Sequence, residues 1–76
     1  MNIDQILDVK GFNCPYPILR AKKLLHGMQP GQVLEVQATD PGSVKDFDHF
    51  CKQTGHALVE FKDDGKVFTY LIRRKD

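Results

Sequence analysis

The sequence predicts an α+β two-layer sandwich in which a four-stranded mixed sheet carries two helices on one face. Three observations support this fold class. The 76 residues are enough for one small domain only, so we expect residues 1–76 to form a single unit. Turn residues occur at even intervals along the chain and leave six segments. The hydrophobic repeat of these segments is typical of strands and helices in the order β-α-β-α-β-β.

The first three segments show two strands and one helix. In residues 5–10, Leu7 and Val9 alternate with polar neighbours, which indicates a short strand. Residues 17–28 have a helical repeat that gathers apolar side chains on one side, namely Ile18, Ala21, Leu24, Leu25 and Met28. Residues 33–39 alternate again and predict a second strand with one buried face.

The second half predicts another helix and a β-hairpin. Residues 43–54 have a second helical stripe, formed by Val44, Phe47, Phe50, Cys51 and Thr54. Ser43 followed by Asp46 resembles a capping box, and Gly55 marks the helix end. The turn Asp64-Gly65 joins two alternating strands. We expect Ala57, Val59 and Phe61 on one face of the first strand, and Phe68, Tyr70 and Ile72 on one face of the second.

The arrangement of these elements follows from their order and from the polar faces of the strands. Each helix crosses between parallel strands, and the final strand pair is antiparallel, which makes the sheet mixed. Because at least two strands show one polar face, both helices should cover the other face.

Composition limits the classes of function. Eleven Lys and Arg residues balance ten Asp and Glu residues, so we expect neither nucleic acid nor an anionic membrane as a partner through bulk charge. No stretch approaches the roughly 18 apolar residues that span a bilayer. Two cysteines are too few for a secreted disulfide framework, and the first residues do not resemble a secretory leader. We therefore expect a cytoplasmic protein.

The two cysteines predict different roles. Cys51 lies in the apolar stripe of its helix, where a buried thiol acts as a small apolar side chain. Cys14 lies in the loop GFNCPYP, residues 11–17, between a strand and a helix. A helix N-terminus favours a thiolate, so we expect an activated Cys14, with Pro15 and Pro17 stiffening the first turn.

Other interpretations of these residues stay open or are weak. The loop could be a rigid connection with an incidental thiol. A metal site lacks a C-x-x-C pair, and Cys51 is expected to face the core. A Cys/His nucleophile pair would need His49 or His56 to fold back towards Cys14. A redox sensor would lack a resolving cysteine beside Cys14.

The exposed side of the first helix is a candidate docking surface. It carries Arg20, Lys22 and Lys23 together with the apolar side chain of Leu19. Such a basic face is often merely solvated, but an apolar residue among cations also suits recognition of a partner protein.

The sequence resembles the TusA family of small sulfur-carrier proteins, also called SirA-like proteins, over nearly its whole length. The family signature C-P-x-P is present as Cys14-Pro15-Tyr16-Pro17. Further matching segments are Leu7-Asp8 with Gly11, Met28-Gln29-Pro30-Gly31, Asp40-Pro41-Gly42-Ser43, Phe50-Cys51, Gly55-His56 and Tyr70-Leu71-Ile72-Arg73. Placed between the first strand and the first helix, the C-P-x-P signature becomes specific.

The resemblance implies a cytoplasmic sulfurtransferase that uses no metal or other cofactor. Cys14 would carry sulfur as a persulfide, with Gly11, Pro15 and Pro17 positioning the nucleophile. A cysteine desulfurase or a rhodanese would supply the sulfur, and a downstream relay protein would accept it for tRNA 2-thiouridine synthesis, sulfur oxidation or molybdenum-cofactor supply. The alternative is a small regulatory module that binds protein or nucleic acid and in which Cys14 is incidental.

Overall fold

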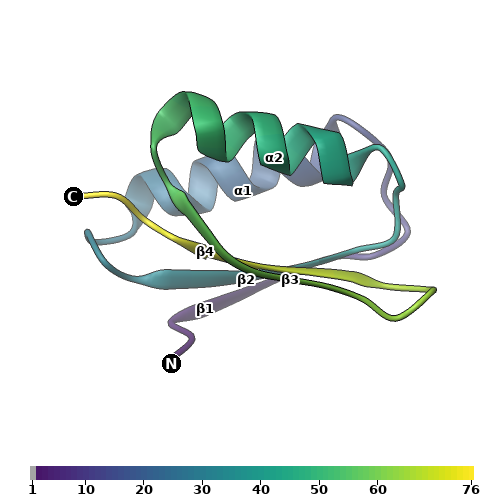
Figure 1. Ribbon diagram of the computed structural model, residues 1–76, viewed down its shortest axis with the longest axis horizontal. Helices are drawn as coiled ribbons and strands as arrows, with labels where there is room; N and C mark the ends of the chain where they lie inside the picture. Colours follow the sequence, from purple (N-terminus) through teal and green to yellow (C-terminus); the bar gives the residue numbers. More distant parts are fainter. Residues whose placement is uncertain (1) are drawn as a thin grey trace.

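The computed structural model describes residues 2–76 and contains the six expected elements in the expected order (Figure 1). They are β1 (Gln5–Val9), α1 (Tyr16–Gly27), β2 (Val33–Ala38), α2 (Ser43–Thr54), β3 (Ala57–Asp63) and β4 (Phe68–Arg73). Every boundary lies within about one residue of the boundary that the hydrophobic repeat predicts. Neither helix in the described part of the chain has the length and apolar character that a membrane span requires.

The sheet is mixed, and both helices lie on one of its faces (Figure 1). The strand order is β1-β2-β4-β3, with β1 parallel to β2 and β4 antiparallel to both of its neighbours. The strands β2 and β3 therefore run in the same direction, as the sequence predicts, but β4 lies between them. This confirms the predicted two-layer fold and adds the spatial order of the strands.

One core fills the space between the helices and the sheet. The strands contribute alternate side chains, and the helices contribute the stripes that their sequences predict. Its members are Leu7, Val9, Ile18, Ala21, Leu25, Met28, Leu34, Val36, Ala38, Phe47, Phe50, Cys51, Tyr70 and Ile72. Cys51 is only 8% exposed, which confirms its prediction as a core residue.

The predicted face of β3 is wrong before an irregularity in its pairing with β4 and right after it, where Phe61 lies opposite the core residue Tyr70. The register shifts between Leu58 and Glu60, as in a β-bulge. Leu58 lies opposite Ile72 and packs against the core, while Val59 falls in the irregularity and is 37% exposed. An extra residue on one strand reverses the alternation of its side chains, and the sequence pattern alone does not show where this happens.

The predicted capping box at the start of α2 is also wrong. Gly42 is the N-cap residue and no side chain caps the helix, although Gly55 ends it in the predicted left-handed conformation (φ 86°). The buried Ser43 hydroxyl instead forms a hydrogen bond of 2.7 Å with the Tyr70 hydroxyl. This bond joins the first turn of α2 to the central strand β4, and it leaves the Asp46 carboxylate free to contact another segment.

The Ser43–Tyr70 bond gives a test of this attachment. The substitution Tyr70→Phe should lower the free energy of unfolding by about 1–3 kcal/mol, because it leaves a buried hydroxyl without its partner. Urea denaturation measures this change, and Tyr16→Phe is the control because Tyr16 is exposed. Equal denaturation midpoints for Tyr70→Phe and the unaltered protein would contradict the account.

Candidate functional site

The loop between β1 and α1 is held in place by the loop between β2 and α2. Gly11 has a positive φ of 86°, a conformation that glycine adopts without steric penalty. Its N–H group donates a hydrogen bond of 2.9 Å to the Thr39 hydroxyl, and the N–H group of Cys14 donates one of 2.8 Å to the Asp40 carboxylate. Both acceptors follow β2, which lies beside β1, so the two loops meet at one edge of the sheet.

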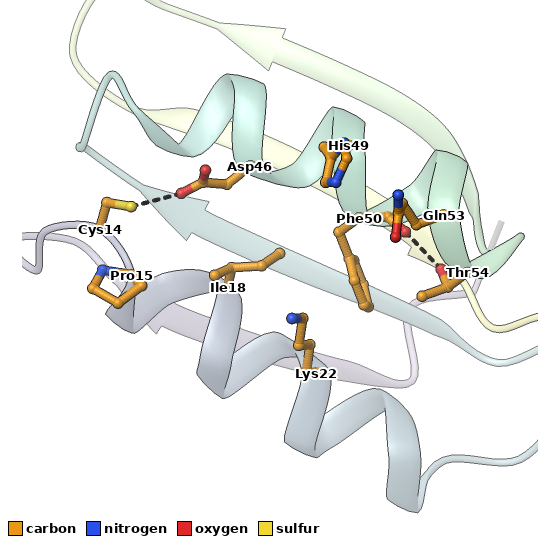
Figure 2. Close-up of a pocket in the computed structure, with 9 residues that line it drawn as sticks. All are labelled: Cys14, Pro15, Ile18, Lys22, Asp46, His49, Phe50, Gln53 and Thr54. Atoms are coloured by element: carbon orange, nitrogen blue, oxygen red, sulfur yellow. Dashed lines mark hydrogen bonds between the residues drawn. The ribbon is translucent and has the colours of Figure 1, made fainter.

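The Cys14 side chain is exposed and faces the start of α2. Its thiol donates a hydrogen bond of 2.9 Å to Oδ2 of Asp46, which Figure 2 shows as a dashed line. This bond raises the pKa of the Cys14 thiol above its ordinary value. Desolvation and the negative charges of Asp46 and Asp40 act in the same direction.

The prediction that Cys14 has an activated, more acidic thiol is therefore wrong for the isolated chain. The prolines contribute to this result because proline has no backbone N–H group. Pro15 is the N-cap residue of α1 and Pro17 lies in its first turn, so neither position can donate a hydrogen bond to the sulfur. The N–H group of Tyr16 donates to the carbonyl oxygen of Asn13 rather than to the sulfur. Two carboxylates near the thiol outweigh the remaining effect of the helix terminus.

A shallow groove of about 300 Å³ runs from Cys14 between the two helices (Figure 2). Cys14 and Pro15 line one end of the groove, and Lys22 lines its α1 side. His49 and Phe50 line the α2 side. The Lys22 ammonium lies 5.7 Å from the centre of the Phe50 ring, within the range of a cation–π contact. The groove thus carries a positive charge on its α1 side, over the Phe50 ring.

The predicted docking residues divide between the groove and the outer side of α1. Lys22 lines the groove, while Arg20, Lys23 and Leu19 are exposed outside it, and Leu19 is 54% exposed. Phe12 and Tyr16 stack with ring centres 4.5 Å apart and are both exposed. This aromatic pair adjoins Cys14 in the chain and extends the apolar part of the surface.

Neither of the two histidines considered for a Cys/His pair forms a hydrogen bond with Cys14. His49 lines the same groove, but the hydrogen-bond partner of the thiol is Asp46. His56 instead accepts a hydrogen bond from the N–H group of Lys75. Within residues 2–76, no group of three His, Cys, Asp or Glu side chains could hold a metal ion.

Sequence reasoning missed the site residues Asp40, Asp46 and Phe50. Their positions match a turn, a helix cap and an apolar stripe, and each of these local interpretations accounts for the residue without the site. One signal could have indicated Asp40, because loops that follow adjacent parallel strands meet at the same edge of a sheet. Nothing comparable indicates the pairing of Cys14 with Asp46, because Asp46 lies within α2 and not in a loop that follows a strand.

Known proteins match this chain over nearly its full length. Residues 5–74 match the family model described as sulfurtransferase TusA. The chain is 62% identical over 73 residues to the sulfur carrier protein TusA of Allochromatium vinosum, covering 96% of each protein. It is 42% identical over 74 residues to a putative sulfur carrier protein of Bacillus subtilis, covering 97% of this chain and 99% of the relative.

A solved structure has the same fold. The SirA-like protein of Desulfitobacterium hafniense superposes with a TM-score of 0.80 at 26% identity, covering 95% of this chain and 99% of the other. The matched region contains the Cys14 loop and both helices. These matches support the sulfur-carrier function and do not favour a regulatory module with an incidental thiol. The chain belongs to the TusA family of sulfurtransferases.

Proposed function

We propose that Cys14 carries sulfur as a persulfide, accepting it from a cysteine desulfurase or a rhodanese and passing it to a downstream relay protein. The observation that carries this proposal is the contrast between the two thiols. Cys14 is exposed at the end of the groove, whereas burial raises the pKa of Cys51 to about 11. A partner protein can reach the sulfur of Cys14 without any opening of the fold.

Sulfur transfer requires an accessible Cys14 sulfur on a rigid part of the backbone. The Cys14 sulfur attacks the outer sulfur of the donor persulfide, the donor S–S bond breaks, and the donor leaves as a thiolate. A thiol of the acceptor later attacks the outer sulfur on Cys14 in the same way. The groove is shallow, so the partner protein would supply much of the surroundings of each transition state.

Three residues around Cys14 support it rather than react. Gly11 permits the loop conformation and donates to Thr39, and Pro15 and Pro17 fix the backbone where α1 begins. Pro17 is also buried. We therefore assign to these residues the positioning of the sulfur.

The docking surface is the exposed face of α1 with the stacked pair Phe12 and Tyr16. Its cations Arg20, Lys22 and Lys23 suit a partner with acidic residues, and Leu19 suits an apolar recess on that partner. Both cysteines are free thiols, a state that a reducing compartment such as the cytoplasm maintains. Synthesis of tRNA 2-thiouridine and sulfur oxidation would both use this transfer step.

Substitution of each cysteine separates the carrier thiol from the core thiol. After incubation with a cysteine desulfurase and cysteine, intact-mass measurement should show one added sulfur atom on Cys51→Ala and none on Cys14→Ser. Cys51→Ala should also lower the free energy of unfolding by about 1–2 kcal/mol, because it removes a small buried side chain. Sulfur on Cys14→Ser together with its loss from Cys51→Ala would contradict the proposal.

Charge reversal on α1 tests the docking surface. Lys22→Glu with Lys23→Glu should slow association with an acidic donor and flatten its salt dependence, while Leu19→Ala should speed dissociation. Stopped-flow transfer at two salt concentrations measures both effects. The matched control is Lys62→Glu with Lys66→Glu, which changes the net charge equally near the β3–β4 turn. Unchanged rates in the α1 variants would place the docking surface elsewhere, with the Asp40–Ser43 loop as the next candidate.

A further inference from the structure

We propose that Asp46 is a catalytic base, which holds the unloaded Cys14 as a neutral thiol and takes its proton when a donor persulfide docks. This inference rests on the proposed function, because it concerns the same sulfur transfer. Asp46 lies at the start of α2, outside the C-P-x-P signature, and the inference gives it a role in the transfer step.

The geometry places one carboxylate on the reacting atom. Oδ2 of Asp46 lies 2.9 Å from the Cys14 sulfur and accepts its hydrogen bond. Asp46 lies in the first turn of α2 and is only partly exposed. The ion pairs described within residues 2–76 involve Lys10, Lys52 and Lys62, and Asp46 takes part in none of them. Its negative charge therefore acts on the thiol without a compensating ion pair.

The other charged and titratable groups around the thiol come from three segments. Asp40, in the β2–α2 loop, accepts the hydrogen bond from the Cys14 N–H group. His49 of α2 and Lys22 of α1 line the groove that runs from Cys14, further along it than Asp46. Lys22 lies over the Phe50 ring, whereas both carboxylates bond directly to Cys14. The groups in direct contact with Cys14 are thus acceptors, and they favour the protonated thiol.

A neutral thiol protects an exposed cysteine between transfers. The thiolate is the form that reacts with oxidants and alkylating agents, so a raised thiol pKa slows these side reactions at neutral pH. A docked donor would bring its persulfide beside Cys14 and exclude water from the groove. Asp46 is then the base within hydrogen-bond distance of the proton that must leave.

The transfer step balances without any oxidant or reductant. The donor reacts in its protonated form, R–S–SH, and the proton of Cys14 moves to the Asp46 carboxylate as the Cys14 sulfur forms a bond with the outer sulfur of the donor. The donor S–S bond breaks, and R–S⁻ leaves and takes a proton from the Asp46 carboxyl group. The net change converts Cys14–SH and R–S–SH into Cys14–S–SH and R–SH.

Loading would also end the contact with Asp46. A persulfide is a stronger acid than the parent thiol, so once the donor has left, Cys14–S–SH releases its proton to water at neutral pH and its outer sulfur becomes anionic. The Asp46 carboxylate repels this anion, and the outer sulfur lies one S–S bond, about 2.05 Å, beyond the sulfur that Asp46 contacts. The Asp46 carboxylate thus binds the Cys14 thiol before transfer and repels the Cys14 persulfide after it, which leaves the outer sulfur accessible to an acceptor.

The test compares Asp46→Asn with Asp48→Asn. Asp48 lies two positions further along α2, is exposed and pairs with Lys52, so its substitution removes the same charge without touching Cys14. Two rates are measured for each full-length protein. The first is the rate of Cys14 alkylation by iodoacetamide from pH 6 to pH 10, with the modified residue identified by peptide mapping. The second is the rate of sulfur acceptance from a desulfurase. Asp46→Glu keeps the carboxylate and is used in addition in case Asp46→Asn folds poorly.

In Asp46→Asn, the alkylation profile should move to lower pH and the rate at pH 7 should rise severalfold. Sulfur acceptance should not rise with it, so the ratio of acceptance to alkylation should fall severalfold. Asp46→Glu should restore part of both values, and Asp48→Asn should match the unaltered protein. An unmoved alkylation profile, or acceptance that rises in proportion to alkylation, would overturn the inference. Failure of the unaltered protein to accept any sulfur would instead overturn the proposed function.

Discussion

Two hydrogen bonds from Cys14 to acidic residues near the start of α2 are the constraint on which the site depends. The backbone N–H group of Cys14 donates to Asp40, and its thiol donates to Asp46. A loop without regular structure would otherwise leave the sulfur in many positions, and ordering it requires contacts that offset the lost conformational entropy. The acceptors lie on α2 and on the loop before it, so the two hydrogen bonds fix the position of the sulfur relative to the packed helices and sheet.

The start of α2 is itself fixed by the sheet. Ser43 bonds to Tyr70 of β4, and the Phe47 and Tyr70 rings stack with centres 4.5 Å apart. The strand β4 pairs along both of its edges, so this attachment lies at the middle of the sheet. The fold therefore connects its most buried aromatic residues to its most exposed thiol through a single turn of helix.

The sequence predicts the elements of this fold well because hydrophobic repeats are local. The two-residue and helical repeats locate all six elements, and the stripe of α2 predicts the burial of Cys51. The irregular pairing at Leu58 and the place of β4 between β2 and β3 depend on partners far along the chain. A repeat within one segment contains no information about such partners.

The site is predicted in part for the same reason. The position of Cys14 between a strand and a helix indicates an exposed thiol, and the structure confirms that exposure. The direction of its pKa shift depends on Asp46 and Asp40, which are 32 and 26 positions away. Reasoning from the N-terminus of α1 alone predicts a lowered pKa for Cys14. It includes the partial positive charge of the helix end and omits the two carboxylates that the fold brings to the sulfur.

The location of the sulfur in the loaded, unaltered protein tests the central claim most directly. The protein is incubated with a desulfurase and cysteine, persulfides are trapped by alkylation, and the peptides that contain Cys14 and Cys51 are compared by tandem mass spectrometry. The account predicts the extra sulfur atom on Cys14 alone, because only that thiol is exposed to a partner. A trapped persulfide on Cys51, with Cys14 unmodified, would contradict it.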